Sequence, residues 1–190
     1  MAMPATPQRW NAQMLYALPD DDLRHEIIDG EHFVTPAPRL GHQYVVVELL
    51  SVLRTYLRAH GIGIVLTAPA DVELSDDTVV EPDIFVIPPV KGPLPVRWTD
   101  PAALLLVIEV TSPSTASRDR VRKRLRYQRA GIREYWIVDA DARLIERWRP
   151  GDERPEIATD TLLWQLATPG QPVLQIVLDE IFEQESAVSD

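Results

Sequence analysis

The sequence contains no cysteine, which excludes disulfides, thiolate metal sites and cysteine nucleophiles. No apolar run approaches the roughly 18 residues of a membrane-spanning helix, and the chain does not start with a basic region and a long apolar stretch. The four histidines lack close metal-ligand spacing, and neither a Gly-x-Ser-x-Gly motif nor a phosphate-cradling glycine loop occurs. We therefore expect a soluble, cytoplasmic protein without a membrane partner, and not a zinc enzyme, a serine hydrolase or a P-loop NTPase.

Lysine is scarce as well, since Lys91 and Lys123 are the only lysines among nineteen basic residues. The formal net charge of −10 argues against tight, non-specific adhesion to nucleic acid, because that affinity depends on cations that contact phosphates. Residues 118–133 reverse the balance with eight basic residues and one acid, Asp119. Such a segment can be an anion-contacting face or a solvated helix that pairs with neighbouring acids, and composition leaves both readings open.

The composition suits one globular domain. The chain has 190 residues, of which 45% are hydrophobic, so we expect a single domain over residues 1–190. A short N-terminal helix is expected first. The Asp29-Gly30 pair between two β-prone runs predicts a hairpin over residues 25–35. Apolar residues then recur at spacings of three and four over residues 42–60, which predicts a helix.

The middle of the chain alternates between strands and a helix. We predict three strand segments in 63–89, a strand at 104–111, a basic helix at 117–130, and a strand, turn and strand in 133–150; the tail then has a loop, a strand at 173–178 and a helix at 179–185. A helix that connects two strands of one sheet implies that those strands are parallel. The order predicts an α/β fold with a mixed sheet flanked by helices.

Two carboxylates stand out in this pattern. Glu109 interrupts an otherwise apolar strand, where an unpaired charge is costly, and Asp83 begins the preceding strand. If the strands are neighbours, both side chains can lie on one face near one end of the sheet, a typical arrangement for Mg²⁺. Lys123, with Tyr127 one turn further on, can face that end from the basic helix. The alternative is that one lysine among many arginines stands there by chance.

The strings HEIIDGE, TVVEPDIFVI, VIEVTSPSTASRDRVRKRLRYQRAGIREYWIVD and LDEIF resemble, in order and spacing, the Uma-two family of restriction-endonuclease-like proteins. The resemblance covers about residues 10–182. It implies the PD-(D/E)XK nuclease core of a helix, three strands, a helix and a strand, with Asp83 and Glu109 as its two acids. The usual lysine position, two residues after the glutamate, is Thr111 here. The resemblance implies that Lys123, from the following helix, takes its place.

The function implied by this resemblance is metal-dependent hydrolysis of phosphodiester bonds in nucleic acid, with DNA as the expected substrate. Asp83, Glu109 and the Val110 carbonyl are expected to hold Mg²⁺ or Mn²⁺, and Lys123 to orient the attacking water. Glu26 and His42 match polar positions of the family, and each can flank the site. The alternative for Glu26 is a surface acid of the hairpin, and for His42 a residue near a helix start without a metal role. Contacts to the nucleic-acid backbone are expected from four arginines: Arg118, Arg120, Arg122 and Arg126.

Two function classes stay open at this level. One is an active Mg²⁺-dependent nuclease, which the set of Asp83, Glu109 and Lys123 favours. The other is a nuclease-fold protein that binds a partner or nucleic acid, or regulates another protein, without cutting; the acidic net charge favours it. A homodimer is also open, because nuclease-fold proteins often pair to act on two strands.

Overall fold

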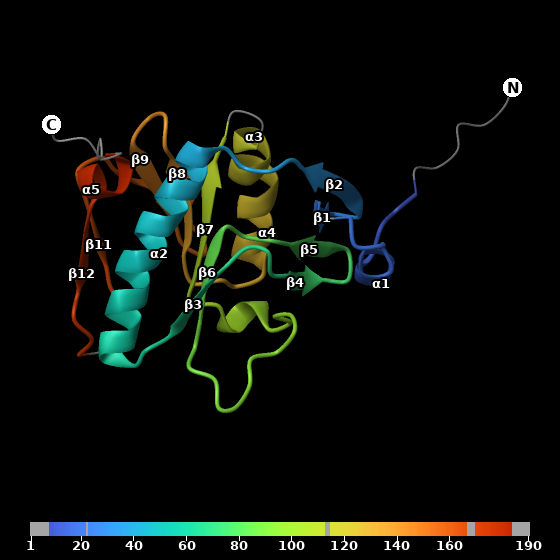
Figure 1. Cartoon of the computed structure of the whole chain (residues 1–190), viewed down its shortest axis with the longest axis horizontal. Helices are drawn as coiled ribbons and strands as arrows, with labels where there is room; N and C mark the ends of the chain where they lie inside the picture. Colours follow the sequence, from blue (N-terminus) through green and yellow to red (C-terminus); the bar gives the residue numbers. More distant parts are fainter. Residues whose placement is uncertain (1–7, 22, 113–114, 167–169, 184–190) are drawn as a thin grey trace, which may run out of the picture.

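The computed structural model describes residues 8–21, 23–112, 115–166 and 170–183. In this part of the chain, a six-stranded mixed sheet forms the centre of an α/β fold. Figure 1 shows helix α2 (Leu40–His60) in front of this sheet, a four-stranded sheet on one side of it and a two-stranded sheet on the other. The mixed sheet flanked by helices is the architecture predicted from the sequence.

The four-stranded sheet contains the predicted hairpin. Strands β1 (Arg24–Ile28) and β2 (Glu31–Thr35) pair antiparallel around a two-residue turn. Asp29 and Gly30 have φ angles of 58° and 75°, and this turn requires positive φ at both positions. Helix α1 (Ala12–Tyr16) packs Ala12 and Leu15 onto this sheet, which has the strand order β2-β1-β5-β4.

The long helix α2 covers one face of the six-stranded sheet. Its buried residues repeat at helical spacing and pack on β6, β7 and β8 together with α5 (Leu178–Phe182). The helix ends at Gly61, which adopts the left-handed conformation with φ 63°. The predicted helix over residues 42–60 is therefore confirmed, with two further residues at its start.

The six-stranded sheet has the order β10-β9-β8-β7-β6-β3. Only β7 and β8 are parallel within it, as the predicted crossover requires. The crossover consists of α3, the π-helical segment η2 and α4, which together cover the second face of the sheet. The bounds are β3 (Ile64–Thr67), β6 (Ile84–Ile87), β7 (Leu106–Thr111), α3 (Ala116–Arg118), η2 (Asp119–Lys123), α4 (Arg124–Arg129), β8 (Tyr135–Asp139), β9 (Leu144–Trp148) and β10 (Glu156–Ala158).

Several predicted boundaries were wrong. Residues 63–89 form four strands, not three, because the turn at 75–78 folds β4 (Val72–Ser75) onto β5 (Thr78–Val80) and sends this pair to the hairpin sheet. The 3₁₀ helix η1 (Pro101–Ala103) precedes β7. The predicted tail loop contains β10 and β11 (Thr161–Trp164), and β11 pairs with β12 (Leu174–Val177).

The last predicted helix is shorter than expected: α5 ends at Phe182, and the predicted end at residue 185 lies outside the described residues. Among the described residues, none of the helices is both long and apolar enough to span a membrane.

Candidate active site

Asp83 and Glu109 meet where two adjacent strands of the large sheet reach the same edge. Strands β6 and β7 are antiparallel with Ile84 opposite Ile108, so the next position along the register sets Asp83 opposite Glu109. Both carboxylates point to the face that is covered by α4, because side chains alternate along a strand. Their side chains are 5% and 3% exposed, respectively. The predicted juxtaposition is therefore present.

A cavity of about 500 Å³ opens at this edge. Its walls come from the end of β7, the start of α2, the loop after β2, and the helix that follows β7. Six residues predicted from the sequence line it: His42, Asp83, Glu109, Val110, Arg118 and Lys123. Glu26 and Tyr127 are buried behind this wall, each in contact with a lining residue.

The two oxygens of Asp83 face different partners. Oδ2 accepts hydrogen bonds from His42 Nε2 at 3.1 Å and from the Val110 backbone N–H at 2.8 Å. Oδ1 faces the Arg24 guanidinium at 2.9 Å. Burial opposes ionisation, but the hydrogen bond from His42 and the positive charge of Arg24 outweigh it and lower the pKa of Asp83 to about 2. Asp83 is therefore ionised at neutral pH.

The two oxygens of Glu109 also face different partners. Oε1 accepts hydrogen bonds from Lys123 Nζ at 2.8 Å and from the Tyr127 hydroxyl at 2.9 Å, while Oε2 faces Arg24 at 3.7 Å. Burial raises the pKa of Glu109 to about 7, against the attraction of Lys123. The repulsion from Asp83 acts in the same direction as burial. Glu109 is therefore much more readily protonated than Asp83.

Lys123 is enclosed by three carboxylates, of which Asp119 is the most distant, with its Oδ1 3.9 Å from Nζ. Its Nζ lies 2.7 Å from Glu26 Oε1 and 2.8 Å from Glu109 Oε1, and the side chain is 1% exposed. Burial would lower the pKa of Lys123, but the charges of Glu109 and Glu26 raise it above the ordinary value. Lys123 is therefore a fixed ammonium that holds Glu109 in place, and it is not a base.

The helix that carries Lys123 is locally wider than an α-helix. In η2 the Arg124 N–H bonds the Asp119 carbonyl five residues earlier, which is the π-helical pattern. Segments of this kind occur often at functional sites because they alter which side chains face inward. Asp119 and Lys123 are the two buried residues of this segment. Composition did not predict this segment.

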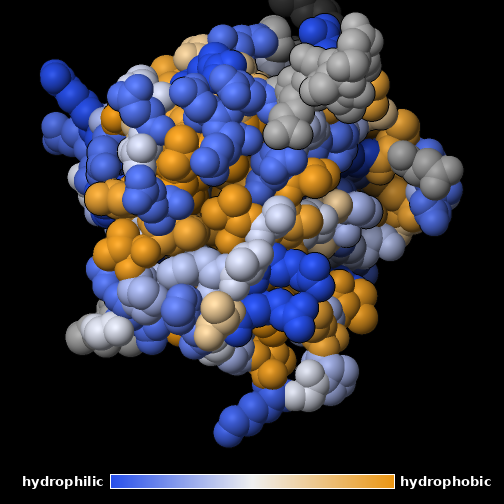
Figure 2. Space-filling view, turned by 60° about the vertical axis from the view of Figure 1, so that its left-hand side comes forward, coloured by the Kyte–Doolittle hydropathy of each residue, from blue (hydrophilic) through white to orange (hydrophobic). Residues whose placement is uncertain are grey.

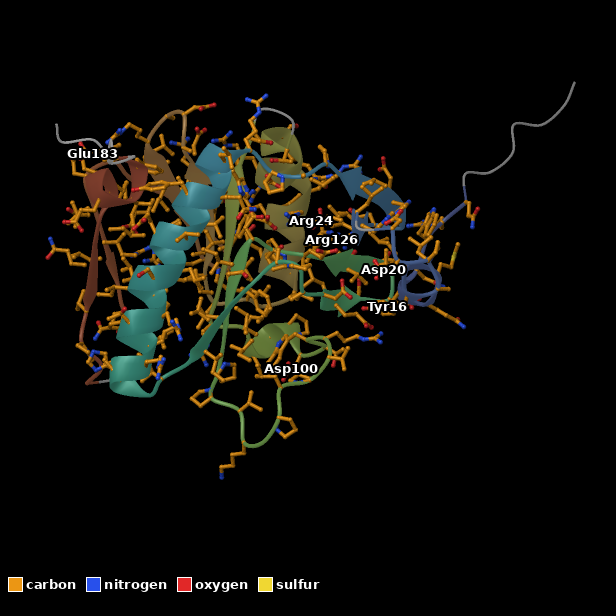
Figure 3. All side chains as sticks on the ribbon, in the orientation of Figure 1. Tyr16, Asp20, Arg24, Asp100, Arg126 and Glu183 are labelled. Atoms are coloured by element: carbon orange, nitrogen blue, oxygen red, sulfur yellow. The ribbon has the colours of Figure 1, made fainter. Side chains whose placement is uncertain are left out.

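Sequence reasoning missed Arg24. Its guanidinium contacts three acids, at 2.9 Å from Asp83, 3.7 Å from Glu109 and 3.9 Å from Glu26. Figure 3 shows Arg24 between the hairpin sheet and the helix that contains α4. The signal was available: Arg24 and Glu26 are two residues apart on one strand, so they share a face.

The structure does not bring the four predicted backbone-binding arginines together. Arg118 lines the cavity, hydrogen-bonds the Thr35 hydroxyl at 3.1 Å and lies 3.7 Å from Glu26. The other three pair with acids away from the cavity lining: Arg120 with Asp139 and Glu146, Arg122 with Glu31, and Arg126 with Asp29. For these three, the pairing is that of a solvated helix with its acidic neighbours.

The donor set suits a divalent cation of the Mg²⁺ type, although no ready-made cluster of three or more His, Asp or Glu ligands occurs among the described residues. Asp83 Oδ1 and Glu109 Oε2 both face the guanidinium of Arg24, the first its Nη1 at 2.9 Å and the second its Nη2 at 3.7 Å, so a cation already lies between them. Mg²⁺ needs only one or two carboxylates, since water and substrate oxygens complete its octahedron. Val110, whose carbonyl was predicted as a further ligand, lines the same cavity.

Comparisons with known proteins show the fold and the family of this chain. The solved structure of a protein from Anabaena variabilis, described as "a putative nuclease belonging to DUF820", superposes with a TM-score of 0.75 at 20% identity, over 90% of this chain and 97% of that one. At this identity the likeness shows the fold. The comparison with curated proteins gave no significant match. The model of the Uma2 family, described as "Putative restriction endonuclease", matches residues 12–178, and the chain therefore belongs to the Uma2 family.

Proposed function

We propose that this protein is a metal-dependent nuclease that hydrolyses phosphodiester bonds of DNA. One observation carries the proposal: two buried carboxylates on adjacent strands each have one oxygen fixed by the protein and turn the other, Asp83 Oδ1 or Glu109 Oε2, toward the position of the Arg24 guanidinium. That position borders a cavity large enough for a phosphodiester group. Membership of the Uma2 family supports the same reaction.

The roles of the residues follow from their contacts. Asp83, Glu109 and the Val110 carbonyl would hold Mg²⁺ or Mn²⁺, which supplies Lewis-acid activation of the phosphate and of the attacking water. His42 and the Val110 N–H fix Asp83. Lys123 and Tyr127 fix Glu109, and Glu26 holds Lys123 from the other side. These fixed side chains need no reorganisation during the reaction.

Substrate positioning is assigned to cations on the cavity wall. Arg118 lines the cavity and is the one of the four predicted arginines that could contact a phosphate next to the bond that is cut. A contact of this kind positions the nucleic acid without reading its sequence. The net charge of −10 makes non-specific adhesion weak, so we expect a substrate that is bound through few phosphates.

The test is a cleavage assay on supercoiled and linear DNA with Mg²⁺ or Mn²⁺. Asp83→Asn and Glu109→Gln should each lower the cleavage rate by about a hundredfold or more, because each removes a charged metal ligand. Asp141→Asn is the matched control, since Asp141 lies on the same cavity wall, is exposed, and has no described ion pair. Cleavage that persists in Asp83→Asn, or without any divalent metal, would exclude this function.

Lys123 is tested as a positioning residue. Lys123→Met removes the ammonium between Glu26 and Glu109 and leaves two buried acids without their partner, so its fold must be checked by circular dichroism. The double variant Lys123→Met with Glu26→Gln lowers that cost by removing one of the acids. If either variant folds and cuts DNA at the wild-type rate, Lys123 is not a positioning residue of the site.

The second candidate is a nuclease-fold protein that binds without cutting. The observation in its favour is that both metal-facing oxygens already have a cationic partner, Arg24, in this structure. Absence of cleavage with every nucleic acid and divalent metal, together with measurable binding, would support it. A homodimer, which would present two sites to a duplex, is tested by light scattering with and without DNA.

A further inference from the structure

Lys123 and Arg24 both lie among the buried carboxylates of the site, but they are held very differently. Lys123 makes two short contacts, 2.7 and 2.8 Å, to Glu26 and Glu109, and its side chain is 1% exposed. Arg24 makes one short contact, 2.9 Å to Asp83, with its other two acidic contacts at 3.7 and 3.9 Å. Its side chain is 21% exposed and its buried Nε has no hydrogen-bond partner among the described residues. Arg24 is thus the less firmly held cation.

The position of Arg24 conflicts with a bound metal ion. Its two terminal nitrogens face Asp83 Oδ1 and Glu109 Oε2, and these are the oxygens left free once the fixed hydrogen bonds of both carboxylates are counted. A divalent ion on the same oxygens would stand within contact distance of the guanidinium. Two positive charges at that separation repel strongly in a buried site, so both cannot occupy it.

Space for a second arginine position lies directly beside the first. Arg24 is itself on the wall of the 500 Å³ cavity, together with Arg118 and Arg39. Arg24 is the first residue of strand β1, so its long side chain can rotate without displacing residues in the interior of the strand. Guanidinium groups bind phosphate oxygens in a bidentate manner, which makes this cavity wall a suitable place for a displaced Arg24.

We propose that Arg24 occupies the metal position in the metal-free protein and swings into the cavity when a divalent ion binds, where it becomes a phosphate-binding residue for the substrate. This inference rests on the proposed function. It assigns Arg24 two successive partners: first the carboxylates Asp83 and Glu109, then a phosphate oxygen. No covalent step is involved, and Lys123 keeps its place throughout.

The first experiment measures Mn²⁺ binding by calorimetry without nucleic acid, with the wild type and each variant in the same buffer at the same pH. Arg24→Gln should bind Mn²⁺ at least about tenfold more tightly than the wild type, because the competing charge is gone. Arg39→Gln is the matched control: Arg39 lies on the same cavity wall but is exposed, and it forms no described ion pair with either carboxylate. Its Mn²⁺ affinity should stay within about twofold of the wild type.

A second measurement uses the wild-type protein and so does not depend on the folding of the glutamine variant. Addition of Mg²⁺ should shift the NMR signal of the Arg24 Nε–Hε group, which is identified by its loss in Arg24→Lys, and leave the signal of Arg39 in place. An unshifted Arg24 signal at saturating Mg²⁺ would overturn the inference, as would unchanged or weaker Mn²⁺ binding by folded Arg24→Gln.

The two proposals can fail separately. If the wild type cuts DNA with metal but Arg24→Gln gains no Mn²⁺ affinity, Arg24 does not compete with the metal and this inference is overturned. The proposed nuclease function is then unaffected. If Arg24→Gln gains affinity in a protein that cuts no nucleic acid, Arg24 has the inferred role and the nuclease proposal fails.

Discussion

At the scale of single residues, the site consists of carboxylates whose oxygens have unequal tasks. The hydroxyl of Tyr127 donates to the buried oxygen of Glu109 at 2.9 Å, whereas the hydroxyl of the neighbouring Tyr135 donates to the Asp119 backbone carbonyl at 3.3 Å. Both rings are fully buried. The two tyrosines therefore offer a matched pair for measuring what a hydrogen bond to a carboxylate contributes.

We predict that Tyr127→Phe lowers the free energy of unfolding by about 1–2 kcal/mol, because it removes a donor from a buried, partly ionised acid. Tyr135→Phe should cost less, about 0.5–1 kcal/mol, since its bond is longer and its acceptor is neutral. Urea denaturation of both variants checks the difference. An equal cost for the two would show that Tyr127 does not support Glu109 specifically.

The raised pKa of Glu109 predicts a pH-dependent stability. Its pKa is about 7 in the folded chain and 4.5 ordinarily, so between these pH values the folded chain binds more protons at this residue than the unfolded chain. The contribution of Glu109 to the free energy of unfolding is therefore most favourable at low pH and falls, by up to roughly 3 kcal/mol, as pH rises from 4.5 to 7.

Urea denaturation of the wild type and of Glu109→Gln across this range tests the prediction. The difference between the two stability curves should slope with pH from 4.5 to 7, and parallel curves would contradict it. Asp83 does not mask the effect, because its lowered pKa of about 2 places its own change at lower pH, where its stabilising contribution is lost on acidification.

At the scale of elements, regular patterns were predictable and local irregularities were not. The period of α2, the Asp29-Gly30 turn and the parallel pairing of β7 with β8 all follow from patterns that extend over several residues. Short strands such as β10 and β11 were missed because three or four residues carry too little periodicity. The π-helical segment η2 was missed because its hydrogen-bond shift leaves no mark in composition.

The candidate site also has a part that the sequence pattern predicts and a part that it does not. The convergence of Asp83 and Glu109 was predictable, since two adjacent strands with acids at the same edge can form only a few arrangements. Arg24 was missed because its importance depends on how the hairpin packs on the helix after β7, and hydrophobic periodicity does not encode that packing.

The end of α2 gives a prediction at this scale. Gly61 has φ 63°, and an added Cβ would meet no atom within 4 Å, so a substitution there costs backbone strain alone. Gly61→Ala should lower the free energy of unfolding by about 1 kcal/mol, and Gly61→Asn by less, because asparagine tolerates the left-handed region. Urea denaturation measures both; equal costs would mean that contacts, and not backbone strain, decide the effect.

At the scale of the whole molecule, charged side chains are arranged more in ion pairs than in patches of one sign. Four arginines of the segment 118–133 already pair with acids, Arg118 among them with Glu26 at 3.7 Å. Figure 2 shows hydrophilic and hydrophobic residues interspersed on the face that it displays. Exposed apolar side chains include Leu40 and Val96. Cations for a phosphate backbone are therefore expected mainly around the cavity, where Arg39 and the loosely paired Arg118 lie.

This charge arrangement predicts a weak dependence of DNA binding on salt. Each neutralised phosphate adds about −0.9 to the slope of log K against log salt concentration. Without metal, Arg24 stays on the carboxylates, so a contact set limited to Arg39 and Arg118 gives a slope of about −2. Fluorescence anisotropy with labelled duplex, in the absence of divalent metal, measures this slope.

Arg118→Gln should reduce the magnitude of the slope by about one, while Arg122→Gln, which removes a cation paired with Glu31, should leave it unchanged. A slope near −6, the value for all seven arginines of 118–133, would show instead that the arginines leave their acidic partners to bind DNA along the whole helix.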